Sequence, residues 1–241
     1  MYEQCAIIAF VLKAVCFDFF NTLAYFYPPR EECYARFADE VGIKVTPEAI
    51  GQALPEADRY WRNENFKSPI KERPAQEKYA TYTKYALLIL RLAETQPTPE
   101  QALQVLDNAF SVGFKFVAFD DAVPALMAVK RKNLTAGVIS NVGQEIDSSC
   151  NEMGLTPYLD FKVTSFEVGL DKPHPLIFRK ALEKAGVQAS EALFVGDQYE
   201  QDVIGARNVG INPILLVRDN GVTRADCPVI HSLTELEAYL S

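Results

Sequence analysis

Residues 13–23 read KAVCFDFFNTL, a run of strand-forming apolar residues that leads into an aspartate and a turn-prone pair. We predict a buried strand that ends at Asp18, followed by a turn at Asn21 and Thr22. In an open α/β sheet, ligands bind along the edge formed by the carboxyl ends of the strands. A carboxylate in that place can act as a nucleophile, bind a metal ion or cap the following turn.

From residue 114 onward, expected strands alternate with expected helices. Strands are predicted at residues 135–140, 161–164, 192–195 and 214–217. Helices are predicted before, between or after them, at residues 124–132, 144–153, 175–185, 202–208 and 233–240. This alternation is typical of an α/β fold with a doubly wound parallel sheet, so we predict a Rossmann-like core.

A helical segment separates the first strand from the others. An aromatic loop at residues 24–29, which ends in two prolines, precedes this segment. Apolar residues three and four positions apart then predict helices at residues 31–41, 47–54, 56–63, 76–93 and 99–112. We therefore predict a Rossmann-like core made of residues 1–27 and 114–241, with an inserted α-helical domain made of residues 28–113.

The composition limits the partners. A formal net charge of −8 and a pI of about 4.9 argue against nucleic acid, which is bound through clustered Lys and Arg. No segment is long enough to span a membrane, and the apolar residues 5–12 are interpreted as a lead-in to the first strand or an extension upstream of the natural start. Five cysteines without a CxxC spacing favour neither a zinc site nor disulfides. We expect a cytoplasmic monomer or homodimer with a small-molecule substrate.

Polar side chains stand at or after the ends of several predicted strands. Because the carboxyl ends of parallel strands meet at one edge of the sheet, we expect these side chains to converge. They are Asp18, Thr22, Ser140, Asn141, Lys172, Asp197 and Asp202. Their hydroxyl, amide and ammonium donors can hold a phosphoryl or carboxylate group beside a carboxylate nucleophile. Neighbouring aspartates repel each other unless a cation lies between them, and Mg²⁺ prefers such oxygen ligands.

Four short motifs together resemble the haloacid dehalogenase superfamily of hydrolases. They are FDFFNTL at residues 17–23, VISN at 138–141, KP at 172–173 and VGDQYEQD at 195–202. Each motif alone has little specificity, but all four occur in order and at strand ends. The resemblance covers residues 13 to about 217, and it implies that the helical insertion is an α-helical (C1-type) cap domain.

The resemblance also implies roles for the site residues. Asp18 is expected to be the nucleophile, which forms an aspartyl intermediate that water later hydrolyses. Thr22, Ser140 and Lys172 are expected to bind the transferred group, and Asn141 offers a further amide donor next to Ser140.

The resemblance further implies a magnesium site. Its expected ligands are Asp18, Asp197 and the backbone carbonyl of residue 20, which is Phe20 in this chain. Asp202 is expected to hold the metal directly or through water.

One residue departs from the pattern of the family's phosphatases. They usually carry a second aspartate two residues after the nucleophile, as general acid and base, whereas this chain has Phe20. A phenyl ring cannot protonate a leaving alkoxide, and such assistance is typically worth ~10²–10⁴-fold in rate. Family members that displace halide from 2-haloacids also lack that aspartate, but Asp197 followed by Asp202 is the magnesium-dependent pattern.

Three interpretations follow from this conflict. We favour a magnesium-dependent phosphatase that acts on a small phosphorylated metabolite. The alternatives are a metal-independent 2-haloacid dehalogenase and a weakly active binding protein that has kept the pocket.

Three arginines of the insertion are candidate substrate ligands. Arg59 and Arg62 are three positions apart on a predicted helix, so they share a face that could bind an anionic substrate. Arg30 follows the double proline and could meet a substrate carboxylate. A solvated basic face is the simpler explanation of Arg59 and Arg62.

Overall fold

The computed structural model describes residues 11–141, 146–218 and 225–240, and the chain divides into two compact units. Unit 1 comprises Met1–Tyr25 and Ala118–Ser241, and unit 2 comprises Phe26–Val117. The sequence predicts the divisions at 27/28 and 113/114, a few residues away from these boundaries. The apolar lead-in predicted at residues 5–12 lies outside the described residues except for Val11 and Leu12.

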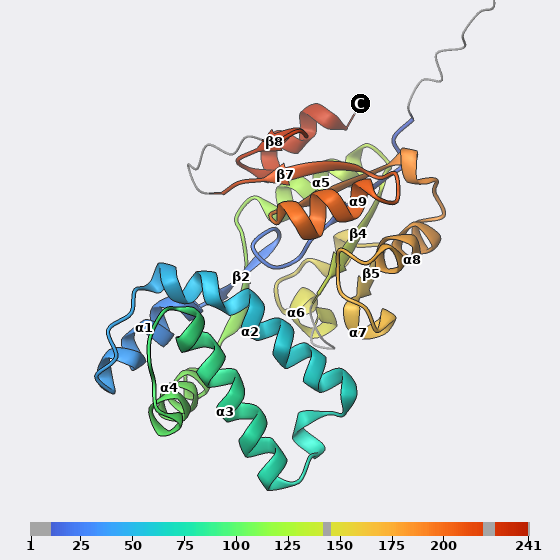
Figure 1. Cartoon of the computed structure of the whole chain (residues 1–241). Helices are drawn as coiled ribbons and strands as arrows, with labels where there is room; N and C mark the ends of the chain where they lie inside the picture. The colour runs from blue at the N-terminus through green and yellow to red at the C-terminus, as the bar shows by residue number, and fades with distance from the viewer. Residues whose placement is uncertain (1–10, 142–145, 219–224, 241) are drawn as a thin grey trace, which may run out of the picture. The chain divides into compact units, whose positions relative to one another are not determined.

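Unit 1 is built on a parallel sheet. Its strands are β1 (Ala14–Phe17), β4 (Thr135–Ser140), β5 (Phe161–Thr164), β6 (Ala192–Gly196), β7 (Asn212–Leu216) and β8 (Val229–Ile230). Among the described residues these six form one sheet in the order β5-β4-β1-β6-β7-β8 (Figure 1). Each neighbouring pair is parallel, and Phe17 of β1 lies opposite Val138 and Val195. The prediction of a doubly wound α/β core is confirmed.

Helices cover the two faces of this sheet. The α-helices are α5 (Ala122–Arg131), α6 (Ile146–Glu152), α7 (Ser165–Val168), α8 (Pro175–Ala185) and α9 (Gly205–Arg207). The 3₁₀ helices are η2 (Thr156–Tyr158), η3 (Ala189–Glu191) and η5 (Leu233–Tyr239). Helix α5 packs with η5, and α8 packs on β4, β5 and α9 (Figure 1). Phe178 of α8 packs edge to face on Phe194 of β6, with the ring centroids 5.4 Å apart. This aromatic contact helps to hold α8 on the sheet.

Two predictions for the last third of the chain are wrong in detail. The helix predicted at residues 202–208 is a π-helix, η4 (Tyr199–Ile204), which continues into the single turn of α9. A π-turn widens the backbone locally and is common at functional sites. The helix predicted at residues 233–240 is the 3₁₀ helix η5, capped by Ser232 and Glu235. The first residues of the helix predicted at 144–153 lie outside the described part.

The segment predicted as an aromatic loop at residues 24–29 begins instead with a strand. β2 (Ala24–Tyr27) pairs with β3 (Lys115–Ala118) as a separate two-stranded sheet. Aromatic residues favour paired strands, and the rings of Phe26 and Phe116 stack here with their centroids 4.3 Å apart. The chain therefore leaves and re-enters unit 1 through paired strands.

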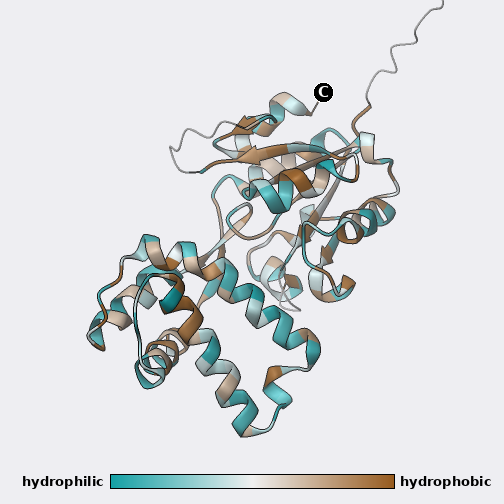
Figure 2. Cartoon of the chain, in the orientation of Figure 1, coloured by the Kyte–Doolittle hydropathy of each residue, from teal (hydrophilic) through white to brown (hydrophobic). Residues whose placement is uncertain are grey.

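Unit 2 is helical between β2 and β3. Its elements are α1 (Arg30–Glu40), α2 (Pro47–Lys67), η1 (Ile70–Glu72), α3 (Ala75–Leu92) and α4 (Pro99–Ser111). Their apolar faces form one core, which includes Tyr34, Ile50, Ile89 and Leu106. Figure 2 shows the corresponding pattern, with hydrophilic and hydrophobic residues mixed along α2 and α3 and a largely hydrophobic β7 in unit 1. Among the described residues, no helix has the length and apolar character required to cross a membrane.

The prediction of two helices at residues 47–54 and 56–63 is wrong, because α2 is continuous through Pro55. A proline inside a helix costs about 3 kcal/mol. Ile50 and Leu54 before it and Ala57 after it are all buried in the unit 2 core. Burying an Ile or Leu side chain stabilises by about 1.5–3 kcal/mol, so tertiary packing outweighs the proline.

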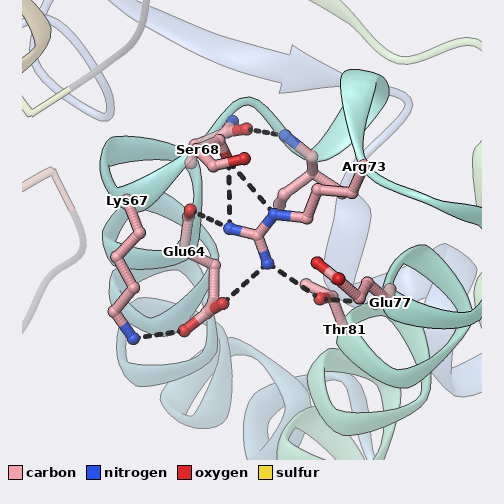
Figure 3. Close-up of polar contacts among 8 residues, drawn as sticks. Glu64, Lys67, Ser68, Arg73, Glu77 and Thr81 are labelled. Atoms are coloured by element: carbon pink, nitrogen blue, oxygen red, sulfur yellow. Dashed lines mark hydrogen bonds and ion pairs between the residues drawn. The ribbon is translucent and has the colours of Figure 1, made fainter.

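The carboxyl end of α2 is closed by one arginine (Figure 3). Arg73 donates from Nη2 to the carbonyl oxygens of Glu64 and Ser68, the latter at 2.9 Å. Its Nη1 donates to Glu64 Oε2 at 2.8 Å and to Thr81 Oγ1 of α3 at 3.2 Å. The guanidinium thus satisfies helix-terminal carbonyls that lack partners within the helix, and it joins α2 to α3.

We expect Arg73→Met to lower the free energy of unfolding of unit 2 by about 1–3 kcal/mol, because buried carbonyl and carboxylate groups lose their donor. Trp61 is the single tryptophan and stacks on Tyr82 within unit 2, so its fluorescence during urea unfolding reports this unit. The control is Lys67→Met, which removes only the exposed end of the same network and should cost less than about 1 kcal/mol. Equal losses in both variants would contradict this role of Arg73.

Candidate active site

The predicted site residues of unit 1 lie at the carboxyl edge of its sheet. Asp18 follows β1, and its backbone N–H donates to the carbonyl of Val195 in β6 at 2.8 Å. Ser140 ends β4 and Asp197 follows β6, the two strands that flank β1. The sheet therefore joins three motifs that are far apart in the sequence.

Lys172 is the centre of the charged cluster. Its Nζ lies 2.5 Å from Asp18 Oδ1 and 2.6 Å from Asp202 Oδ1. All three side chains are buried, and Lys172 is only 4% exposed. An ammonium shared by two carboxylates neutralises part of a charge that burial would otherwise make very costly.

Asn141 fixes the backbone of Lys172. Its side-chain Oδ1 accepts from the Lys172 N–H at 2.7 Å, and its Nδ2 donates to the Lys172 carbonyl at 3.2 Å. Nδ2 also donates to Gln201 Oε1 at 2.8 Å. The Asn141 amide thus holds the lysine loop and the π-helix η4 together, and its expected role as a donor to a bound group stays a prediction.

Three carboxylates lie close enough to share a metal ion. Asp18, Asp197 and Asp202 each offer an oxygen atom, and these atoms lie within 4.8 Å of one another. Asp197 Oδ1 is buried and has no hydrogen-bond partner in the described part of the chain. A buried carboxylate oxygen without a donor is costly, and hard oxygen donors of this kind are the ligands that Mg²⁺ takes. The donor set therefore fits a magnesium ion.

The pKa values of the clustered side chains are set by burial and by the excess of carboxylates over ammonium groups. Burial raises the pKa of Asp18 to about 6, although Lys172 acts in the opposite direction. Burial, together with the charges of Asp18 and Asp202, raises the pKa of Asp197 well above its ordinary value. Burial alone would lower the pKa of Lys172, but its two carboxylate partners raise it. Three acids share one ammonium, so the cluster favours binding a further cation.

Gly196 allows Asp202 to reach this cluster. A Cβ atom at residue 196 would lie 2.3 Å from Asp202 Oδ2, closer than any real contact of that kind. That oxygen accepts a hydrogen bond from the backbone N–H of Gln198 at 2.9 Å. In the Gly-Asp pair of the fourth motif, glycine is therefore required by packing against Asp202, whereas the aspartate contributes the carboxylate of the site.

Two hydroxyl groups predicted to bind a transferred group are buried near the strand ends. Thr22 is fully buried, and its Oγ1 has no hydrogen-bond partner among the described residues. Ser140 is buried as the last residue of β4. Phe20 is partly buried and forms a backbone bridge to Ala24, and its carbonyl as a metal ligand stays a prediction.

The three arginines proposed as substrate ligands belong to unit 2. Arg30 donates to both carboxylate oxygens of Asp58, at 2.8 and 2.9 Å, and to Tyr85 Oη at 2.9 Å. Arg59 forms an exposed ion pair with Glu56, and Arg62 lies further along α2. Whether any of the three contacts a substrate stays a prediction.

Sequence reasoning missed two residues that hold the site. Gln201 stands directly before Asp202 inside the fourth motif, so its position could have indicated a role. Arg218 donates to the backbone carbonyls of Asn21 and Thr22. It directly follows the strand predicted at residues 214–217, and the strand-end rule that found the other site residues applies to it as well.

Comparisons with known proteins identify the family of this chain. The family model for haloacid dehalogenase-like hydrolases matches residues 12–210. A ribulose-1,5-bisphosphate 5-phosphatase from Halopiger xanaduensis is 30% identical over 204 residues, which cover 84% of this chain and 83% of that protein. The haloacid dehalogenase-like hydrolase domain-containing protein 3 of Mus musculus is 27% identical over 234 residues, covering 95% and 92%.

A solved structure shares the fold. The crystal structure of a HAD phosphatase from Thermococcus onnurineus aligns with a TM-score of 0.56 and 25% identity, covering 95% of this chain and 98% of that one. The family match spans most of the chain and includes the motifs that supply Asp18, Lys172 and Asp197. This chain therefore belongs to the haloacid dehalogenase-like hydrolase family.

Proposed function

We propose that this hydrolase is a magnesium-dependent phosphatase that acts on a small phosphorylated metabolite through an aspartyl-phosphate at Asp18. The observation that carries the proposal is the close group of Asp18, Asp197 and Asp202, of which Asp18 and Asp202 share the ammonium of Lys172, while Asp197 Oδ1 is buried without a partner in the described structure. The sequence relationship to a ribulose-1,5-bisphosphate 5-phosphatase supports the same reaction class. The acidic composition and the scattered cysteines suit a cytoplasmic enzyme.

In the first step, a carboxylate oxygen of Asp18 attacks phosphorus, and the bond from phosphorus to the substrate's ester oxygen breaks. The departing alkoxide takes a proton from water, because Phe20 has no proton to give, and the hydroxide that remains is neutralised by a proton of the phosphate released in the second step. In the second step, water attacks phosphorus and the bond to Asp18 breaks, which releases phosphate and restores the carboxylate.

The chain's own donors offset the charge of the phosphoryl group. Lys172 holds Asp18 ionised and oriented through the contact of 2.5 Å. The hydroxyl of Thr22, which has no hydrogen-bond partner in the described part of the chain, is available to phosphoryl oxygens, and the hydroxyl of Ser140 is proposed as a second donor. Asp18, Asp197, Asp202 and the carbonyl of Phe20 would hold Mg²⁺, which when bound supplies positive charge against the repulsion between carboxylate and phosphate.

Unit 2 is proposed to act as the helical cap that selects the substrate. It is inserted between the Asp18 motif and the Ser140 motif, and loops or domains in that place commonly close over an active site.

A second candidate, hydrolysis of a 2-haloacid, is favoured by Phe20. Halide leaves without a proton, so the missing acid would not matter for that reaction. Asp18 would then attack carbon instead of phosphorus, and halide would depart. Asp197 weighs against this reaction, because a further buried carboxylate without a cation would repel both the nucleophile and a carboxylate substrate.

The first test compares phosphate release from an aryl phosphate with halide release from a 2-halopropionate, each with Mg²⁺ and with chelator. We expect phosphate release only with Mg²⁺, because an aryl phosphate needs little help from an acid. Asp18→Asn should lower the rate by about 10³-fold or more, since the nucleophile is lost. The matched control is Asp226→Asn, a surface aspartate paired with Arg207, which should keep wild-type activity. Halide release that persists in chelator would identify a dehalogenase instead.

The second prediction concerns the metal site and needs no turnover. The raised pKa of Asp197 means that the folded protein binds this proton more tightly than the unfolded chain does. Without metal, the ionised carboxylate therefore destabilises the fold, increasingly as pH rises above the ordinary carboxyl range. In chelator at about pH 7.5, Asp197→Asn should have a higher Tm than the wild-type protein, because the substitution removes the destabilising carboxylate.

Added Mg²⁺ should reverse this order. It should raise the Tm of the wild-type protein by binding the folded state, and it should have little effect on Asp197→Asn. Differential scanning calorimetry with and without Mg²⁺ measures both effects. Equal metal-induced shifts in the two proteins would remove Asp197 from the metal site.

A further inference from the structure

The guanidinium of Arg218 lies under the turn that follows the nucleophile. Its Nε donates to the carbonyl of Asn21 at 3.1 Å, and its Nη2 donates to the carbonyl of Thr22 at 2.6 Å. The same group forms two bonds to Asp121, from Nη2 to Oδ1 at 2.9 Å and from Nη1 to Oδ2 at 3.1 Å. Its central carbon lies 3.6 Å from the centroid of the Phe119 ring. Each of its three nitrogens is therefore used, and the plane of the group is fixed.

Asp121 is itself held in place. Its Oδ2 also accepts from Ser232 Oγ and from the backbone N–H of Leu233, each at 2.9 Å. The side chains of Arg218 and Asp121 are only 21% and 14% exposed. The pair is thus anchored to the chain before α5 and to the start of η5, and a bidentate pair with several supporting bonds has a defined geometry.

The turn that Arg218 holds is tight and partly strained. Asn21 has a left-handed backbone, with φ of +59°, and its N–H donates to the carbonyl of Ala24 at 2.7 Å. The N–H of Leu23 donates to the carbonyl of Phe19 at 2.9 Å. Within this turn Thr22 is fully buried, and its hydroxyl has no partner among the described residues. The carbonyl of the residue that carries this open hydroxyl receives the shortest of the Arg218 bonds.

We propose that Arg218, oriented by Asp121, is a positioning residue that fixes the Asn21–Thr22 turn so that the Thr22 hydroxyl and the Asp18 carboxylate address the same phosphoryl group. This inference rests on the proposed phosphatase function. Arg218 acts through the backbone and does not touch the reacting atoms. A lysine could replace it only in part, because a single ammonium lacks the planar fork that reaches two carbonyls and a carboxylate at once.

The test compares Arg218→Met and Arg218→Lys with a matched control. Arg207 forms the same kind of bidentate pair elsewhere in unit 1, with Asp226 at 2.8 and 3.0 Å, but it does not bind the nucleophile turn. Arg207→Met therefore loses a bidentate ion pair of the same kind, though a more exposed one, that makes no bond to the nucleophile turn. Kinetics with an aryl phosphate and Mg²⁺ and the Tm are measured for every variant.

We expect Arg218→Met to lower kcat by about 10–100-fold with KM little changed, because a misplaced hydroxyl is lost mainly from the transition state. Arg218→Lys should recover a part of kcat, and Arg207→Met should keep it. In a Thr22→Val background, Arg218→Met should lower kcat by much less, since the group that it positions is already absent. Full additivity of the two substitutions, or an unchanged kcat in Arg218→Met, would overturn the proposal.

A second measurement does not depend on turnover. Hydrogen–deuterium exchange of the peptide that covers residues 17–24 should speed up in Arg218→Met and stay unchanged in Arg207→Met. If the wild-type protein released no phosphate, the proposed function would fall, and exchange would still decide whether Arg218 holds the turn. Unchanged exchange in Arg218→Met would refute the positioning role whatever the activity.

Discussion

The ammonium of Lys172 between Asp18 and Asp202 is the interaction on which the rest of the site depends. Moving an ion into a protein interior costs several kcal/mol even after relaxation, and here three charged side chains are buried together. Two of them would repel each other without the third. The cluster forms only because the loop before α8 delivers Lys172 with its backbone fixed by Asn141. Electrostatics and loop geometry are therefore inseparable in this site.

The same cluster is incomplete as it stands. One ammonium cannot neutralise three carboxylates. Burial and the excess negative charge raise the pKa of Asp197, whose Oδ1 has no hydrogen-bond partner among the described residues. Unfavourable electrostatic arrangements of this kind cluster at functional sites in folded proteins. A divalent cation would supply the missing positive charge, and a phosphoryl group would accept the hydrogen bonds that the site can donate. A carboxylate substrate without a metal ion leaves the imbalance in place.

The support of the site comes from segments that are distant in sequence. Asn141 and Gln201 tie the lysine loop to η4, while Arg218 and Asp121 tie the nucleophile turn to the start of α5. Asn141 and Arg218 bind backbone carbonyls, and each also binds a side chain, Gln201 and Asp121 respectively. Their positions in the motifs and at the strand ends mark Asn141, Gln201 and Arg218 as candidates, but the sequence does not say which carbonyl or amide each of them binds. Unit 2 has its own core and its own partly buried ion pair between Arg30 and Asp58, which gives that arginine a structural partner inside the unit.

The sequence by itself determined the alternation of strands and helices, the order of the motifs and the identity of the charged side chains. Strands β4 and β5 and helix α8 were predictable to the residue. Asn133 and Asn141 flank the apolar run of β4, and Pro175 and Gly186 mark the two ends of α8. Only the tertiary structure decided that α2 continues through Pro55, that residues 199–204 form a π-helix and that residues 24–27 pair as a strand. In each case long-range packing or pairing outweighed the local preference. The same reason applies to the site: composition and spacing name Asp18, Lys172 and Asp202, but the distances of 2.5 and 2.6 Å that make them one unit exist only because a parallel sheet brings their loops to one edge.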